Sequence, residues 1–205
     1  IIIEGVSRLH ATDYQVIPDR IVTGTMMLAA AITRGSITLR NVNPMHLVSL
    51  LDVVKQSGVE ITYGHDIITV KASRSFRVIA RIMTAPYPGF PTDMQSQMMA
   101  FLSLARGCSI IKETVFDGRF RHVNELCRLG ADIYVDLNTA FIRGVPRLSG
   151  AVVEATDLRA GAALIIAGLA AEGETRVTQS YHIDRGYDRI EDQLVSLGAR
   201  IRRVQ

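Results

Sequence analysis

Three segments of the chain are apolar at nearly every position, unlike the one-sided pattern of a surface helix. They comprise residues 26–32, 98–102 and 162–167. A helix that lacks a polar face is buried on every side. The pattern therefore predicts three helices packed in the interior of the protein.

A second set of segments is amphipathic. In the clearest one, the apolar residues that share a face are Leu47, Leu50, Leu51 and Val54. Asn43 suits the N-cap of this helix, Pro44 its first turn and Gly58 its end. A counterpart near the end of the chain ends at Gly198.

Short β-rich runs separate the helical segments. Those that follow a glycine or a helix end are residues 36–39, 59–63, 131–135 and 199–204. The isoleucines at positions 1–3 also read as part of a strand, so we expect the chain to be a piece of a larger protein. The predicted order is strand, buried helix, strand, amphipathic helix, strand.

This order recurs three times with matched spacing. Each copy begins at an acidic residue, namely Asp19, Asp93 and Asp157, and a glycine follows after 16, 14 and 16 residues. A second glycine follows after a further 23, 23 and 25 residues. The spacing predicts one domain over residues 1–205, built of three repeats at about 1–70, 71–142 and 143–205.

The stretch from residue 71 to residue 91 joins the first two copies. It ends in a cluster that contains Pro86, Pro88 and Pro91. Proline is excluded from helix interiors and central strands. We therefore predict a rigid loop that positions the residues after it.

The composition fits a globular protein. The chain has 205 residues, 48% of them hydrophobic and 21% charged, and its mean hydropathy is +0.20, which excludes a disordered chain. The longest apolar run, at 160–171, is too short to cross a membrane. No signal peptide is visible, and two cysteines suit a reducing compartment, so we expect a cytoplasmic protein that binds no membrane.

Arginine dominates the basic residues. The chain holds 23 Lys and Arg residues, of which only Lys55, Lys71 and Lys112 are lysine. The guanidinium group of arginine binds a carboxylate or a phosphate through two parallel hydrogen bonds. A compositional bias would, however, give the same number of arginines. The net charge of +3, without a basic run, does not indicate a nucleic-acid partner.

The three acidic residues stand where buried helices begin. Thr92 and Gln95 fit a capping box around Asp93. An acidic residue at this position is also favoured by the helix dipole alone. Both a structural and a catalytic role therefore remain open.

Two arginines, Arg20 and Arg159, lie next to helix starts, and two more, Arg119 and Arg185, each stand 12 residues after a repeat glycine. Helix N-termini favour anions, so the repeat predicts a convergent cationic site with Asp93 as a candidate base. The alternative is that each arginine pairs with its neighbour in sequence, which would be Asp19, Asp117, Asp157 or Asp184.

Metal and cofactor signals are weak. The histidines, at positions 10, 46, 65, 122 and 182, show no paired spacing, and surface or hydrogen-bonding roles are expected for them. Cys108 and Cys127 are expected to be inert core thiols. Gly118 suits a turn, and no glycine-rich phosphate loop is present. We expect neither a metal nor a cofactor.

Four runs of the sequence resemble the enolpyruvyl transferases. They are residues 86–95 (PYPGFPTDMQ), 113–116 (ETVF), 155–160 (ATDLRA) and 181–187 (YHIDRGY). The resemblance spans the chain but covers only the C-terminal half of such an enzyme. It implies an α/β fold, an inside-out barrel of three βαβαββ repeats with buried helices inside and sheets outside. The second catalytic domain is absent from this chain.

Within the family, the runs resemble the branch that acts on a UDP-sugar. The resemblance implies transfer of the enolpyruvyl group of phosphoenolpyruvate to the 3-hydroxyl of UDP-N-acetylglucosamine, with release of phosphate. This reaction is the first committed step of peptidoglycan precursor synthesis. The chain alone is expected to be inactive, because its partner is the missing N-terminal half.

The resemblance also implies residue roles. Asp93 would be the base and a sugar contact, Val115 would contact the UDP-sugar through its backbone, and Asp157 would lie near the reacting centre. The arginines that would hold the phosphate and carboxylate of phosphoenolpyruvate are Arg119, Arg159 and Arg185, with Arg20 beside them. Cations next to Asp93 would lower its pKa, so positioning rather than basicity must carry most of its effect.

The chain departs from the family pattern in a few places. The family's reactive cysteine and its N-terminal Lys-Asn pair are missing, and Val22 stands where an acidic residue is expected, which affects the network around Arg20. Two rivals remain: the shikimate branch of the family and a non-catalytic anion-binding paralogue. Unchanged turnover by an Asp93→Asn variant of the complete protein would favour the second.

Overall fold

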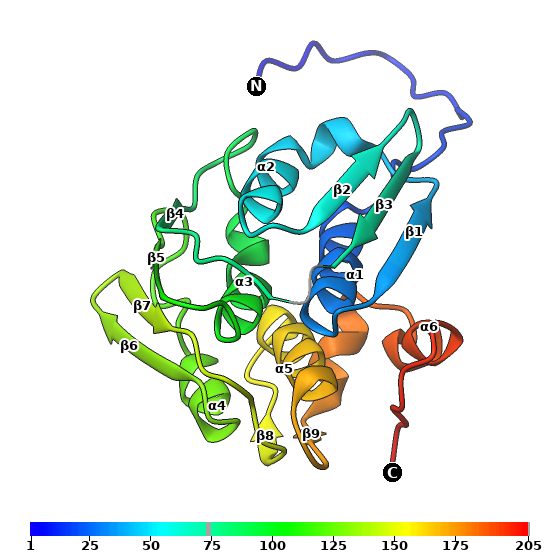
Figure 1. Ribbon diagram of the computed structural model, residues 1–205. Helices are drawn as coiled ribbons and strands as arrows, with labels where there is room; N and C mark the ends of the chain where they lie inside the picture. The colour runs from blue at the N-terminus through cyan, green and yellow to red at the C-terminus, as the bar shows by residue number, and fades with distance from the viewer. Residues whose placement is uncertain (73–74, 205) are drawn as a thin grey trace.

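Three apolar helices, α1 (Arg20–Ile32), α3 (Gln95–Leu102) and α5 (Leu158–Ala170), pack against one another in the interior (Figure 1). The computed structural model describes residues 1–72 and 75–204. Every residue of α3 is buried, as are most residues of α1 and α5. The prediction of three core helices is confirmed.

The strands form three sheets within the described residues. The first is antiparallel, in the order β1 (Ser36–Arg40), β3 (Ile67–Lys71), β2 (Glu60–Tyr63). The second has the order β4 (Arg81–Met83), β5 (Cys108–Lys112), β7 (Thr139–Arg143), β6 (Asp132–Asp136), with β4 and β5 parallel. The third is a parallel pair, β8 (Val152–Glu154) and β9 (Arg176–Thr178).

The register of the first sheet gives it one apolar face. Val70 on β3 lies opposite both Ile37 on β1 and Ile61 on β2, and all three side chains are buried. Because successive strand residues alternate between faces, this row turns toward the core while its neighbours face outward. The chain is a mixed α/β protein, and its three apolar helices α1, α3 and α5 lie next to one another (Figure 1).

The smaller helices are α2 (Val48–Gln56), α4 (Val123–Arg128) and α6 (Ile190–Ser196). Asn43 acts as a cap, because its Oδ1 accepts a hydrogen bond of 3.0 Å from the Met45 N–H. It caps a short 3₁₀ turn, η1 (Pro44–His46), and α2 begins only after that turn. Gly58 ends the α2 segment with a φ of 88°, as predicted.

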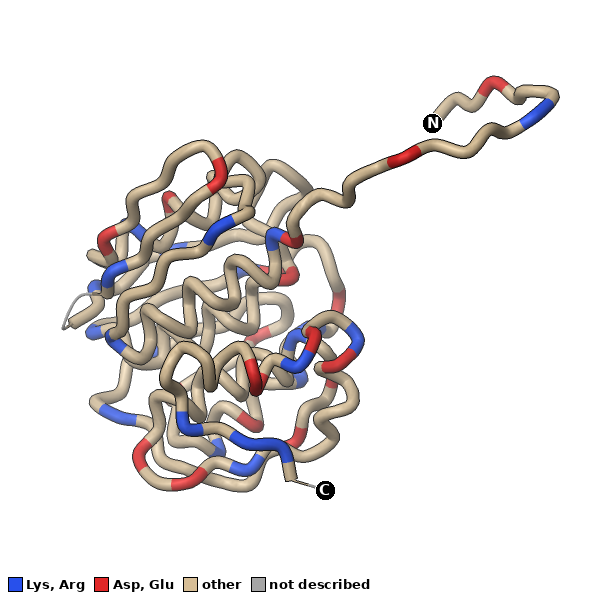
Figure 2. Tube along the Cα trace, turned by 90° about the vertical axis from the view of Figure 1, so that its right-hand side faces the viewer, with Lys and Arg blue, Asp and Glu red and all other residues tan. Residues whose placement is uncertain are grey.

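Two predicted strands are wrong. Residues 1–3 belong to an exposed segment without regular structure, which extends away from the body in Figure 2. Residues 199–204 are not a strand either, and they line a groove of about 1190 Å³ with α1 and α5. A strand is stabilised by hydrogen bonds to a neighbour, and no described strand pairs with either segment.

The proline-rich stretch between β4 and η2 (Thr92–Met94) is a loop, as predicted. Its Tyr87–Pro88 peptide bond is cis, and the Ser49 hydroxyl of α2 donates a hydrogen bond of 2.9 Å to the Gly89 carbonyl. The preceding part of the link includes residues 73 and 74, which lie outside the described residues. The loop therefore enters η2 from a fixed position against α2.

The two cysteines are not core thiols. Both Cys108 and Cys127 are exposed. Cys108 is the first residue of β5 and faces outward in its alternating pattern, and Cys127 lies beside the buried Leu126 on the outer face of α4. None of the described helices is long and apolar enough to cross a lipid bilayer.

A buried polar cluster links the three core regions. The hydroxyls of Thr25 on α1 and Tyr187, which follows η3 (Ser180–Arg185), lie 2.8 Å apart. The Gln97 Nε2 of α3 donates hydrogen bonds of 3.1 Å to Thr25 and 3.4 Å to Tyr187. Polar groups in an apolar core fix the relative positions of the helices, since each must meet its partner.

Candidate active site

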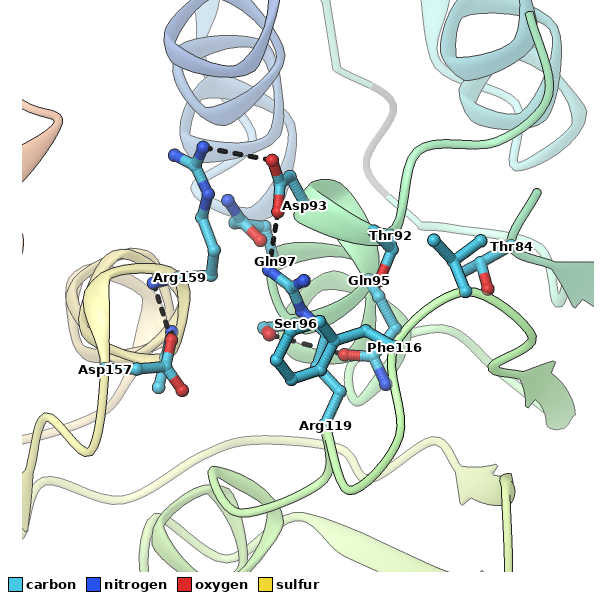
Figure 3. A network of polar contacts seen from close by, with 12 residues as sticks. Thr84, Thr92, Asp93, Gln95, Ser96, Gln97, Phe116, Arg119, Asp157 and Arg159 are labelled. Atoms are coloured by element: carbon cyan, nitrogen blue, oxygen red, sulfur yellow. Dashed lines mark hydrogen bonds and ion pairs between the residues drawn. The ribbon is translucent and has the colours of Figure 1, made fainter. Parts of the chain in front are cut away.

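Asp93 lies between two arginine side chains (Figure 3). The Arg119 Nη2 donates a hydrogen bond of 2.6 Å to Asp93 Oδ1, and the Arg159 Nη2 donates one of 3.2 Å to Oδ2. The side chains of Arg119 and Arg159 are 13% and 15% exposed, so both cations are largely removed from solvent. One carboxylate between two guanidinium groups leaves a net positive charge that can bind an anion.

Three different elements bring these residues together. Asp93 lies in η2, directly before α3, and Arg159 lies in the first turn of α5. Arg119 comes from the loop between β5 and α4. The starts of two core helices therefore meet at one end of the protein, as the repeat predicted.

Asp157 and Asp19 act as helix caps. The Asp157 Oδ1 accepts hydrogen bonds from the N–H groups of Arg159, at 2.8 Å, and Ala160, at 2.9 Å. The Asp19 Oδ1 accepts from Ile21 and Val22 in the same way at α1. The capping of α5 fixes the residue that carries one of the two guanidinium groups, so Asp157 has a structural role at the site.

The predicted capping box at Asp93 is wrong. The Thr92 hydroxyl does not cap the helix but donates a hydrogen bond of 2.9 Å to Glu113 Oε2. The Gln95 side chain is buried and accepts a hydrogen bond of 3.3 Å from the Ser96 hydroxyl. Because η2 precedes α3, the turn that a capping box would close is already a 3₁₀ turn. Asp93 is thus free to face the arginines.

The environment of Asp93 lowers its pKa. Burial of the carboxyl group acts in the opposite direction, because it disfavours the charged form. The charges of Arg159 and Arg119, together with their hydrogen bonds, outweigh burial and hold the pKa below its usual value. The direction matches the prediction that cations next to Asp93 lower its pKa.

His122 lies beneath the site and is 1% exposed. Its Nε2 lies 3.3 Å from Met99 Sδ. Burial lowers the pKa of His122 to about 4, against the opposing effects of the Asp157 charge and the Arg119 backbone. Within the described residues, no group of three or more His, Cys, Asp or Glu side chains is placed to hold a metal ion.

The remaining predicted residues make no hydrogen bond or ion pair with Asp93 among the described residues. The guanidinium of Arg20 lies 5.0 Å from the Tyr87 ring centroid, in a cation–π contact. Val115 is exposed, and its N–H donates a hydrogen bond of 2.8 Å to Glu113 Oε1. Arg185 is the exposed last residue of η3 and makes no ion pair among the described residues.

Pairing with sequence neighbours, the alternative for the arginines, is not what the structure shows. Asp184 pairs with Arg203 rather than with Arg185, through hydrogen bonds of 2.6 and 2.9 Å. The two arginines at Asp93 reach it across 26 and 66 residues of sequence. These contacts are long-range, which is typical of a site assembled by the fold.

Sequence patterns missed two buried residues at the site, Glu113 and His122, which are 3% and 1% exposed. A single acidic residue after an apolar strand belongs to no repeated spacing. Its place in the sequence therefore does not distinguish a buried side chain from an exposed one. A single histidine is equally uninformative. The available signals for Glu113 were its position directly after strand β5 and its place in the run 113–116, and neither indicated a role for its side chain.

The sequence matches the family model of EPSP synthase (3-phosphoshikimate 1-carboxyvinyltransferase) over residues 1–194. Relatives named UDP-N-acetylglucosamine 1-carboxyvinyltransferase include proteins from Magnetococcus marinus, 52% identical over 204 residues, and Desulfosudis oleivorans, 50% identical over 204 residues. These matches cover 100% of this chain and 49% of each relative. The chain therefore spans about half the length of the relatives it matches.

Solved structures give the same picture of the fold. The enolpyruvyl transferase NikO from Streptomyces tendae superposes with a TM-score of 0.81 at 30% identity, over 91% of this chain and 44% of NikO. An EPSP synthase from Acinetobacter baumannii superposes with a TM-score of 0.72 at 18% identity, over 86% of this chain and 45% of that protein. The second likeness concerns the fold alone.

Proposed function

The chain belongs to the EPSP synthase family of enolpyruvyl transferases, and from this premise we propose that it is the C-terminal half of a UDP-N-acetylglucosamine 1-carboxyvinyltransferase. The reaction moves the enolpyruvyl group of phosphoenolpyruvate to the 3-hydroxyl of UDP-N-acetylglucosamine and releases phosphate. Identities of 50–52% to relatives of that name, against 18% to an EPSP synthase, support the UDP-sugar as acceptor over a shikimate. The proposed setting is peptidoglycan precursor synthesis in the cytoplasm.

The observation that carries this proposal is the Asp93 carboxylate held between Arg119 and Arg159. Phosphoenolpyruvate has a phosphate and a carboxylate, and fixed guanidinium groups orient both. In this proposal Arg185 and Arg20 would add to the cationic set when substrate binds, and the main chain at Val115 would contact the sugar.

In the proposed reaction, a proton adds to the methylene carbon of phosphoenolpyruvate and the sugar oxygen forms a bond to the enol carbon. The bond from that carbon to the phosphate oxygen then breaks, and loss of a proton from the methyl group restores the double bond. The proton of the attacking hydroxyl passes to Asp93. An anion shared by Arg119 and Arg159 weakens their ion pairs with Asp93. The pKa of Asp93 then moves up toward its usual value, and the carboxylate becomes a better base when substrate is present.

The finer architecture belongs to the same proposal. The three core helices would be the inner helices of three βαβαββ repeats, at about 1–70, 71–142 and 143–205, in one inside-out barrel. The described strands support this arrangement in the first two repeats, where a helix is followed by a hairpin, β2–β3 or β6–β7. The second catalytic domain would come from the other half of the enzyme.

Adding the complementary half tests the proposal. This chain would replace the matching half of the Magnetococcus marinus relative, and phosphate release would be measured with phosphoenolpyruvate and UDP-N-acetylglucosamine. We expect release that requires both substrates in the chimaera, and none from this chain alone. Phosphate release by the isolated chain, or by the chimaera with shikimate 3-phosphate as acceptor, would contradict the proposal.

A further inference from the structure

Glu113 is a buried carboxylate whose hydrogen bonds come from three separate parts of the chain. Its Oε1 accepts from the Thr84 hydroxyl at 2.7 Å, from the Val115 N–H at 2.8 Å and from the Phe116 N–H at 3.0 Å. Its Oε2 accepts from the Thr92 hydroxyl at 2.9 Å. An ionised carboxylate is an acceptor only, and these four donors match its acceptor capacity.

The hydrogen bonds of the two Glu113 oxygens connect this residue to both partners of one ion pair, Asp93 and Arg119. Thr92 precedes Asp93 in η2, so the bond to Oε2 fixes the turn that carries Asp93. The bonds to Oε1 fix the main chain at Phe116, whose ring lies 5.1 Å from the guanidinium carbon of Arg119. Arg119 and Phe116 lie together beside Asp93 in Figure 3.

Side-chain packing does not hold this loop in place. The Val115 and Phe116 side chains are 43% and 57% exposed, so little apolar surface is buried there. Charge-assisted hydrogen bonds from backbone N–H groups to a carboxylate are stronger than neutral ones. The Glu113 carboxylate is therefore the main anchor of the loop that delivers Arg119.

We propose that Glu113 is a positioning residue, which holds Asp93 and Arg119 in register with each other by fixing the Thr92 turn and the Val115–Phe116 loop together. Its consequence for catalysis rests on the proposed function. The structural part of the proposal does not depend on the proposed function, because the Asp93–Arg119 geometry can be measured in this chain alone.

The test uses the carboxyl titration of Asp93, followed by carbon NMR, in three variants. Glu113→Ala removes all four acceptor bonds, and the milder Thr92→Val removes one donor at a half-buried position and keeps the side-chain shape. Glu60→Gln is the matched control, because Glu60 is an exposed residue of β2 that pairs with Lys71. We expect the pKa of Asp93 to rise toward its usual value in Glu113→Ala, less in Thr92→Val, and not at all in Glu60→Gln.

A purely structural role for Glu113 would lower the stability of the chain without moving the Asp93 titration. An unchanged Asp93 pKa in folded Glu113→Ala overturns the proposal. If Glu113→Ala does not fold, an unchanged pKa in Thr92→Val overturns it equally. In the chimaera described above, misplacing Arg119 should lower kcat/KM by about 100-fold in Glu113→Ala. If the chimaera without any substitution is inactive, the result counts against the proposed function. The Asp93 titration still decides the role of Glu113 in that case.

Discussion

Arg159 donates a hydrogen bond of 3.2 Å to the carboxylate of Asp93, a residue 66 positions earlier in the chain. The contact joins the start of α5 to the start of α3, two helices that also pack along their lengths. Since the other Asp93 oxygen accepts from Arg119, both oxygens of the carboxylate are occupied by guanidinium groups. A negative charge in this place keeps two cations close together until an anionic substrate can share them.

Replacing Asp93 by Asn should abolish most of the turnover of the chimaera. The amide keeps the shape of the side chain but cannot accept the hydroxyl proton, and general-base catalysis typically contributes about 10²- to 10⁴-fold to rate. We therefore expect kcat for phosphate release to fall within this range. Asp52→Asn, on the exposed face of α2, is the control and should leave the rate unchanged.

Unchanged turnover in Asp93→Asn would instead favour a non-catalytic, anion-binding role for this cluster. Binding of phosphoenolpyruvate gives a second readout. The variant loses the negative charge that Asp93 holds between Arg119 and Arg159, so its affinity for the anion should rise while its kcat falls. A fall in both quantities would indicate disruption of the site rather than loss of a base.

The repeat predicted which parts of the site come together, but not how the side chains are held. Acidic residues at matched spacing indicated helix starts, and Asp19 and Asp157 do cap helices. Spacing contains no information about partners that are distant in sequence and make single contacts. Glu113 therefore escaped notice, although its four donors lie in three separate stretches of chain.

The errors in the fold have a related cause. A β-rich run becomes a strand only where a neighbour supplies hydrogen bonds, and the run at 199–204 has no such neighbour among the described strands. The exposure of Cys108 depends on which face of β5 turns inward, and the burial pattern of that strand follows from pairing with β7. Both outcomes are set by tertiary contacts rather than by local sequence.

The buried imidazole of His122 should make the protein less stable in mild acid. Its pKa is about 4 in the folded protein against an ordinary value of 6.5. Between these values the unfolded chain binds a proton that the folded protein does not, so the free energy of unfolding falls as the pH falls. The loss should begin below pH 6.5 and reach about 3 kcal/mol near pH 4.

Urea unfolding of the chain at a series of pH values from 7.5 to 4 measures this effect. The control is His122→Gln, which lacks a titrating group but retains a side chain able to hydrogen-bond. The other histidines are present in both proteins, so the difference between the two pH profiles isolates His122. Parallel profiles would show that the folded protein accepts the proton without penalty.

Replacing Tyr187 by Phe should destabilise the core through the Thr25–Gln97–Tyr187 cluster. The hydroxyl of Tyr187 lies 2.8 Å from that of Thr25, and its side chain is among the fully buried ones. The substitution removes the contacts of the Tyr187 hydroxyl with Thr25 and Gln97, while Thr25 keeps its hydrogen bond from Gln97. We expect the free energy of unfolding to fall by about 1–2 kcal/mol. Tyr134→Phe, at an exposed position, should change it by less than about 0.5 kcal/mol.

Gly161 lets the turn that carries Arg185 approach α5 closely. A Cβ atom at this position would overlap Cγ1 of Ile183, a buried residue of η3, and would lie 3.1 Å from the Ala155 Cβ. Overpacking of this kind costs about 1–3 kcal/mol, whereas alanine gains up to about 1 kcal/mol over glycine in a helix. Gly161→Ala should therefore destabilise the protein by about 1–2 kcal/mol, measured by urea unfolding.

A double-mutant cycle with Ile183→Ala separates the two effects. Removing the Ile183 side chain leaves space for the new methyl group, so only the helix propensity remains. In that background Gly161→Ala should stabilise the protein by up to about 1 kcal/mol, a reversal of sign. The same destabilisation in both backgrounds would mean that the close approach of η3 to α5 does not explain the glycine.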